Sequence, residues 1–398
     1  MAHQTTSGSN TALLTRPGSL NGGSDARALY LKLFSGEMFK GFQHNAIARD
    51  LVMKRTLKNG KSLQFIYTGR TTAEFHTPGN SILGNSDGAP PVAEKTITVD
   101  DLLISSAFVY ELDETLAHYE LRGEISKKIG YALAQKYDRL IFRAIAKGAR
   151  QASPISKTDF KEPGGTQIRV GTNDSGADAY VASSLVNAFY DAAAALDEKG
   201  VSSEGRVGVL NPRQYYELIQ QVGENGLVNR DEQGTSRQKG NGIVEIAGIK
   251  IYKSMNIPFF GNYGTIYGTA SATNPGVTSP GNVGDFIGQT DASKWGGLED
   301  ARASVDGVNG NYGNHSDFAN SCGLIFQKEG AAVVEAIGPQ VQVTSGDVSV
   351  VYQGDVILGR LAMGADFLNP AACVELVAGA AVGSTGNAAF GTTYPANG

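Results

Sequence analysis

The residues whose types and spacing could do chemistry are few, and each pattern is incomplete. Gly60-Lys61-Ser62 matches the end of a phosphate-binding loop, but Arg55 stands where that motif requires a glycine. Glu114 and His118 lie one helical turn apart and could share a metal ion, but no third ligand accompanies them. Neither pattern predicts a functional site.

Other motifs of catalysis and cofactor binding are missing from the sequence. Asp100 and Asp101 are adjacent in a strand-like stretch, so their side chains would point to opposite faces and could not share a proton. There is no G-x-S-x-G, H-E-x-x-H or paired C-x-x-C motif. The glycines of 261–268 do not link a strand to a helix as dinucleotide-binding glycines do. We therefore expect no enzyme, no metal and no cofactor.

The composition of the chain argues against several classes of protein. The 398 residues carry a net charge of −5, which argues against a dedicated nucleic-acid binder. Two cysteines, Cys322 and Cys373, provide no disulfide framework, so folding in a reducing cytoplasm is expected. No apolar run approaches about twenty residues, which predicts no membrane partner. The N-terminus lacks the pattern of a signal peptide.

The strongest structural signal is a long helix from Asp113 to about Arg150. Apolar residues recur at helical spacing and form one stripe, Asp113 is a good N-cap, and Gly148 could form a left-handed C-cap. Gly123 and Gly130 are positions at which such a helix could bend. A helix of this length with a single apolar stripe would support other elements.

Basic residues on this helix allow two interpretations. They could contact carboxylates of a partner or nucleic acid, or they could form a solvated helix face with the interleaved Glu120, Glu124 and Asp138 as ion pairs. The sequence leaves both open for Lys127, Lys128, Lys136, Arg139, Arg143 and Lys147.

Strands precede the helix. Lys61–Tyr67, Lys95–Val99 and Leu102–Tyr110 have strand patterns, and nearly thirty residues rich in turn formers separate the first two. A loop of that length in a folded domain usually binds something.

An α+β lobe follows the helix. Ser183–Lys199 is predicted as a helix, Val207–Leu210 as a strand, Asn211-Pro212 as the start of another helix, and 243–255 as a hairpin turning at Gly248. Residues 259–320 are rich in Gly, Asn, Ser and Thr and are predicted as an insertion. Further strands are expected at Gly323–Ala336, Pro339–Tyr352, Val356–Met363 and Phe367–Val377.

The order of these parts resembles the major capsid protein of tailed bacteriophages, a fold shared with encapsulin shells and the floor of herpesvirus capsids. The resemblance is closest to short-tailed phages of the T-seven type, the autographivirus-like podoviruses, cyanophages included. The residues that carry it are Gly69-Arg70-Thr71, Pro78-Gly79, Lys95–Asp100, Leu102-Leu103, Tyr110, His118-Tyr119, Arg122 and Val244–Pro258.

The resemblance implies an α+β fold of the Hong-Kong-phage type with five regions. Residues 1–55 would be the N-terminal arm and 56–110 the extended loop with its strands. Residues 111–179 would be the peripheral domain with the spine helix, 180–335 the axial domain with the 259–320 insertion, and 336–398 the returning peripheral strands and tail.

It also implies a structural protein that self-assembles as pentamers and hexamers into an icosahedral shell around a double-stranded DNA genome. Implied partners are copies of itself, a scaffolding protein encoded separately, a portal, and cement or fibre proteins. DNA would be enclosed without sequence-specific binding. The protein would reside in the virion capsid, after assembly in the host cytoplasm.

Two alternatives remain. One is an encapsulin-type nanocompartment shell. The other is a carbohydrate-binding or hydrolytic β-rich protein that uses Tyr263, Tyr267 and Trp295 of the insertion.

If the resemblance holds, the long loop lies across a neighbouring subunit, and the subunit interface includes residues of the loop and of the helix. The expected interface residues are Arg70, Glu74, Phe75, Pro78, Lys128 and Arg139.

Deleting Thr72–Pro90 should therefore leave folded subunits that cannot assemble, because the contacts of the loop lie in the neighbour. Circular dichroism would report folding, and negative-stain electron microscopy would report assembly. Intact shells from the deleted chain would refute the assignment of this loop.

Overall fold

The computed structural model describes residues 47–69, 75–79, 92–99, 102–110, 121–152, 155, 162–171, 177–220, 245–257, 321–343 and 353–378. Contacts divide the chain into two compact units. The first contains Asp101–Lys136 and Ile337–Met363, and the second contains Ile47–Asp100, Tyr137–Ala336 and the chain from Gly364 onward. The predicted insertion 259–320 lies outside the described residues, as do Glu114, His118, Asp100 and Asp101.

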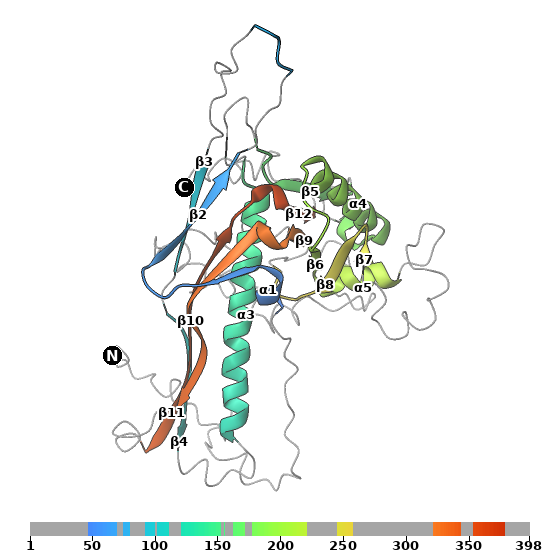
Figure 1. The fold of residues 1–398 in the computed structure, drawn as a ribbon. Helices are drawn as coiled ribbons and strands as arrows, with labels where there is room; N and C mark the ends of the chain where they lie inside the picture. The colour runs from blue at the N-terminus through green and yellow to red at the C-terminus, as the bar shows by residue number, and fades with distance from the viewer. Residues whose placement is uncertain are drawn as a thin grey trace, which may run out of the picture. The chain divides into compact units, whose positions relative to one another are not determined.

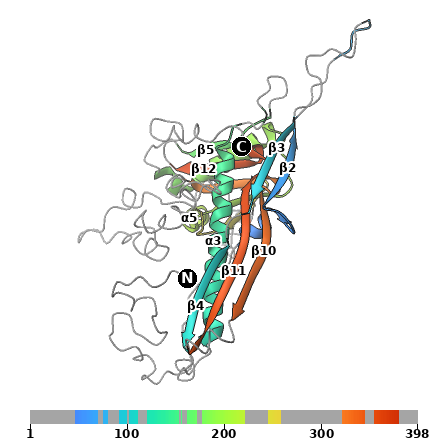
Figure 2. The same ribbon diagram turned by 90° about the vertical axis from the view of Figure 1, so that its left-hand side faces the viewer.

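The first unit packs a sheet on a helix (Figures 1 and 2). Strand β4 (Leu103–Tyr110) pairs antiparallel with β11 (Gly354–Phe367), from Gly354 opposite Tyr110 to Leu361 opposite Leu103. One face of this pair meets the N-terminal part of α3 (Leu121–Ala149), because alternate strand residues and one helix stripe are apolar. Val109, Ile129, Leu133 and Ile357 form the core there.

The second unit is built on a six-stranded mixed sheet with the order β5-β12-β9-β6-β8-β7. Its strands are β5 (Thr166–Val170), β6 (Arg206–Leu210), β7 (Glu245–Ile246), β8 (Ile249–Lys253), β9 (Ser321–Gln327) and β12 (Cys373–Ala378). Every residue of β6 and β12 is buried, including Arg206 and Glu375, which explains why neither sequence alternates between polar and apolar residues.

Two helices of the second unit pack on this sheet. They are α4 (Ala182–Glu198) and α5 (Pro212–Gln220), and short 3₁₀ turns lie at Ala177–Tyr180, Lys328–Gly330 and Pro370–Ala372. Leu185, Phe189 and Leu196 of α4 are fully buried. The Asn211 side chain accepts a hydrogen bond from the Arg213 amide, which confirms its predicted N-cap position before Pro212.

Two further strand pairs involve the N-terminal part of the described chain. After α1 (Ala48–Leu51), β1 (Met53–Thr56) pairs in parallel with the first residues of β10 (Ala331–Val343). Strands β2 (Ser62–Thr68) and β3 (Val92–Thr98) form an antiparallel two-stranded ribbon. The ribbon confirms the strands predicted on either side of the long loop.

The predicted strand Gly323–Ala336 is wrong as a single element. A 3₁₀ turn at Lys328–Gly330 separates β9 from β10, and these strands belong to different sheets. The apolar sequence continues on both sides of the turn, so periodicity does not reveal the change of sheet. Pro339 was also expected to begin a new strand, but it lies inside β10.

The predicted boundaries agree with the structure at some positions and differ from it at others. The helix ends at Ala149, as predicted, whereas its predicted start at Asp113 lies outside the described residues. The predicted domain boundary at 335/336 falls inside β10, and β5 and β12 join the sheet of the predicted axial domain. The five-region division stays a prediction.

The predicted left-handed C-cap at Gly148 is wrong, because Gly148 lies within the helix. A Cβ atom there would lie 2.7 Å from Cβ of Phe367 and 3.2 Å from Sγ of Cys373. The glycine therefore allows close approach of α3 to the end of β11. The hairpin turn, in contrast, uses left-handed backbone at Ala247 (φ 51°) and Gly248 (φ 76°), as predicted for Gly248.

Replacing Gly148 with Ala should destabilise the protein by about 1–2 kcal/mol, because overpacking outweighs the gain in helix propensity. Gly130→Ala on the same helix is the matched control, since a Cβ there meets nothing within 4 Å. It should stabilise by about 1 kcal/mol. Thermal unfolding followed by circular dichroism measures both, and equal shifts would contradict the close approach.

Candidate functional site

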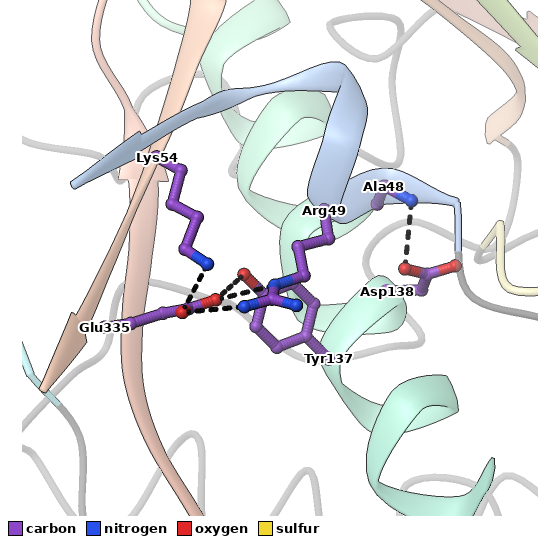
Figure 3. A network of polar contacts seen from close by, with 6 residues as sticks. All are labelled: Ala48, Arg49, Lys54, Tyr137, Asp138 and Glu335. Carbon is purple, nitrogen blue, oxygen red and sulfur yellow. Dashed lines mark hydrogen bonds and ion pairs between the residues drawn. The ribbon is translucent and has the colours of Figure 1, made fainter. Parts of the chain in front are cut away.

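A buried carboxylate, Glu335 of β10, gathers donors from three other elements of the second unit (Figure 3). Arg49 of α1 approaches it with two nitrogens, Nε at 3.0 Å from Oε1 and Nη2 at 3.1 Å from Oε2. Lys54 of β1 lies 2.8 Å from Oε2, and the hydroxyl of Tyr137 of α3 donates to Oε1 at 2.8 Å. The carboxylate thus holds the 47–56 segment to β10 and α3.

The electrostatics of Glu335 follow from these donors. Burial alone would raise the pKa of Glu335, but the hydrogen bonds from Arg49, Lys54 and Tyr137 together lower it below its ordinary value. The pKa of Tyr137 is raised, chiefly by burial and then by the neighbouring carboxylate. Glu335 is therefore held as an anion with its charge compensated.

A second carboxylate, Asp138, holds the start of the same segment. Its oxygens accept hydrogen bonds from the backbone amides of Ile47 at 2.9 Å and Ala48 at 3.0 Å, and from the side-chain amide of Asn256 at 3.3 Å. A third, Glu375 of β12, accepts two hydrogen bonds from Arg150, at 2.7 and 2.6 Å, and others from Gln167 and Ser321. These contacts are structural, with no group placed for catalysis.

One face of the β2–β3 ribbon is attached to other parts of the second unit. Lys95 lies 2.8 Å from the Asp366 carboxylate and 3.9 Å from the ring centre of Phe367. Tyr67 places its hydroxyl 3.4 Å from Oδ1 of Asn369. Ile97 is completely buried on this face.

The opposite face of the ribbon carries exposed apolar side chains. Ile66 is 75% exposed and Val92 is 62% exposed, and they are diagonal neighbours in the antiparallel register. Phe75, in the loop segment that follows β2, is also fully exposed. We call Ile66 and Val92 the apolar ribbon surface. Such a surface is typical of a protein–protein contact.

Comparison with known proteins identifies the family of the chain. A family model described as "Gp10A-like: Major capsid protein" matches residues 64–295, more than half of the chain. The chain belongs to this family. The Gp10A-like family consists of structural capsid proteins, not of enzymes.

Individual relatives of this Gp10A-like chain are also capsid proteins. It is 28% identical over 210 residues to the major capsid protein of Escherichia phage T7, covering 49% of this chain and 57% of that protein. It is 31% identical over 134 residues to the major capsid protein of Enterobacteria phage T3, covering 33% of this chain and 38% of that protein. The matches thus span 57% of the first relative and 38% of the second, less than two thirds of either.

Solved structures extend the similarity over nearly the whole chain. The capsid structure of cyanophage P-SCSP1u matches with a TM-score of 0.62 and 28% identity, covering 90% of this chain and 96% of that one. The mature capsid of bacteriophage PhiM1 matches in fold, with a TM-score of 0.59, 17% identity, and coverage of 92% and 98%. The α+β fold of the Gp10A-like chain is therefore the tailed-phage major capsid fold, as predicted.

The alternatives gain no support from these matches. The similar proteins are phage capsid proteins, which favours a virion over an encapsulin compartment. The aromatic residues of the carbohydrate-binding or hydrolytic alternative lie outside the described residues. No metal-binding group of His, Cys, Asp or Glu occurs in the described part of the chain, and none of its helices is long and apolar enough to cross a membrane.

The predicted interface residues fall into three groups. Arg70 and Glu74 lie outside the described residues. Phe75 and Pro78 are both exposed in the described segment of the loop. Lys128 is exposed in the first unit, whereas Arg139 is half-buried in the second. Phe75 and Pro78 lie in the same short described segment, and the interface role of all six residues stays a prediction.

Of the two interpretations left open for the basic residues of the helix, the solvated face does not hold for Arg143 and Lys147 in the second unit. Arg143 and Lys147 are buried, and burial lowers the pKa of Lys147. Asp138 binds backbone amides instead of forming a helix ion pair. The helix changes from exposed at Lys127 and Lys128 to buried beyond Leu140, which one apolar stripe does not reveal.

Sequence reasoning missed the three structural carboxylates. Glu335 and Glu375 each interrupt a strongly apolar strand, and that isolation was an available signal of a buried ion pair. Asp138 stands among other charged helix residues, so nothing in the sequence marked it as buried. Gly60-Lys61-Ser62 leads into strand β2 rather than a helix, which confirms that it is not a phosphate-binding loop.

Glu335→Gln should reduce the free energy of unfolding by about 1–3 kcal/mol, because buried donors lose a charged acceptor. Because folding lowers the pKa of Glu335, its stabilising contribution is fully present at a pH above the ordinary glutamate pKa of about 4.3. The contribution is lost as the pH falls through the lower pKa of the folded state. Urea denaturation at pH 7 and in acid would measure it.

The matched control is Glu329→Gln, an exposed glutamate nearby, which should change stability by less than about 0.5 kcal/mol. Equal effects of the two substitutions at pH 7 would show that the Glu335 contacts contribute nothing.

Proposed function

We propose that this chain forms the shell of a phage head, self-assembling as pentamers and hexamers into an icosahedral capsid that encloses double-stranded DNA. The observation that carries the proposal is the similarity to the cyanophage capsid protein over 90% of this chain. A closed shell needs modest contacts between copies that close by symmetry. It needs no catalytic site.

The partners follow from the same proposal. Copies of the chain are the principal partner, a scaffolding protein and a portal direct assembly, and cement or fibre proteins bind the outside. The net charge of −5 is compatible with a capsid that encloses DNA without binding its phosphates tightly. Assembly takes place in the host cytoplasm, and the product is the virion capsid.

The apolar ribbon surface is the part of this chain that we assign to contact with a neighbouring copy. On the opposite face of the ribbon, Lys95 pairs with Asp366 and Ile97 is completely buried. These contacts hold the strands that expose Ile66 and Val92. Burying them in a neighbour would remove their apolar area from water, at about 25 cal/mol per Å². Arg70, Glu74, Phe75 and Pro78 extend this contact along the loop, and Lys128 and Arg139 are the helix positions proposed to receive it.

Coexpression of the chain with its scaffolding protein should yield closed shells in negative-stain images. Under the same conditions, the double variant Ile66→Ser with Val92→Ser should stay folded but form few or no shells, because it loses apolar contact area. Gln64→Ser, exposed on the same face of β2, is the matched control and should assemble normally.

Monodisperse monomers from the unaltered chain, measured by light scattering, would count against the shell function itself. Normal shells from the double variant would reject only the ribbon contact.

A further inference from the structure

The attached face of the β2–β3 ribbon lies over a buried carboxylate that has two cations beside it. Asp366 of β11 is 1% exposed, and its Oδ2 atom lies 2.8 Å from Nζ of Lys95 on β3. Lys147 of α3 is the second cation, and it is itself buried. Burial lowers the pKa of Lys147, Asp366 raises it and Lys95 lowers it again, so both charges act on Lys147. Two ammonium groups thus share one carboxylate.

The ring of Phe367 lies beside both ammonium groups. Its centre is 3.9 Å from Nζ of Lys95 and 5.6 Å from Nζ of Lys147, and both distances are in the range of cation–π contacts. Lys95 is close to Asp366 but is not aligned as a hydrogen-bond donor, so Oδ2 has no aligned donor among the described residues. Asp366 therefore keeps an acceptor site for a second donor, and the flexible side chain of Lys147 stands next to it.

A second acceptor under the ribbon shows the same arrangement. The hydroxyl of Tyr67 on β2 lies 3.4 Å from Oδ1 of Asn369, which is a long contact. The same Oδ1 atom accepts a hydrogen bond from the Ala371 amide at 3.1 Å. Departure of the ribbon would leave Asn369 hydrogen-bonded and Asp366 beside Lys147, whereas breaking a buried ion pair ordinarily leaves an uncompensated charge.

The base of the ribbon is attached by packing instead. A Cβ atom at Gly364 of β11 would overlap the carbonyl oxygen of Thr98, the last residue of β3, so the two backbones are in direct contact there. Ile97 beside it is completely buried. This end is the pivot about which the rest of the ribbon can move when the contacts of Lys95 and Tyr67 break.

We propose that the ribbon is a releasable strap and that Lys147 is its reserve counter-ion. When Lys95 leaves Asp366, Lys147 moves to Oδ2 and keeps the buried carboxylate compensated. Release then exchanges one ammonium group for another, which costs less than an isolated buried charge. No covalent bond breaks and no proton is transferred. The proposal does not rest on the shell function, because every group in the strap belongs to one chain.

A double-mutant cycle in the full chain tests the reserve counter-ion, with urea denaturation as the measurement. Lys95→Met and Lys147→Met each leave one ammonium group for Asp366, so each should lower the folding equilibrium constant by less than about tenfold. Together they should lower it by at least about tenfold more than the product of the two single effects, because Asp366 is then buried without a cation. Lys61→Met, at an exposed lysine before β2, replaces Lys147→Met in a control cycle and should show no coupling.

The same cycle in an Asp366→Asn background identifies the carboxylate as the shared group. The coupling between Lys95→Met and Lys147→Met should disappear there, because a neutral amide needs no counter-ion. If the double variant with Asp366 intact fails to fold, Asp366→Asn should restore folding. Failure to restore it, or independent effects of the two lysines while Asp366 is present, would overturn the proposal.

Thiol labelling measures the release itself. Ala93 is half-buried on the attached face of β3, and the two native cysteines are buried. The thiol introduced by Ala93→Cys should react about tenfold faster when Lys95→Met is added, because the strap loses its ion pair. It should react several-fold more slowly when Lys147→Met is added, because release then leaves Asp366 uncompensated. Equal or faster labelling with Lys147→Met would reject the reserve role of Lys147.

Discussion

The contact between Glu335 and its three donors is the interaction on which the 47–56 segment depends. A carboxylate buried in an apolar strand loses its hydration and needs compensation from charged or polar donors. Here Arg49 and Lys54 provide the charge and Tyr137 adds a neutral hydrogen bond. Since the donors come from α1, β1 and α3, the requirement of one carboxylate fixes where three elements meet β10.

Two other buried carboxylates of the second unit are also held by hydrogen bonds, but from different donors. Glu375 receives the guanidinium of Arg150, so its charge is compensated as at Glu335. Asp138 receives only neutral amides and keeps the cost of a buried charge. The difference in donors separates two carboxylates with charged partners, Glu335 and Glu375, from Asp138, whose hydrogen-bond donors are neutral.

In the proposed shell, copies in pentamers and hexamers would meet different neighbours, so a subunit would need a rigid body together with edges that adapt. The buried sheet and the anchored carboxylates supply rigidity in the second unit. The ribbon is attached through Lys95 on one face and exposes Ile66 and Val92 on the other, where we propose that a neighbouring copy binds. Family membership and this arrangement are mutually consistent.

The sequence by itself determined the elements whose cause is local. Periodicity and turn residues located the ribbon strands, α4, α5, the hairpin at Gly248 and the end of α3, and the order of these parts predicted the capsid fold. Tertiary structure alone decided the change of sheet at Lys328–Gly330, the helical role of Gly148, and the burial of Arg143, Lys147 and Asp138. These features depend on neighbours distant in the chain, because burial and charge compensation arise only when separate segments meet.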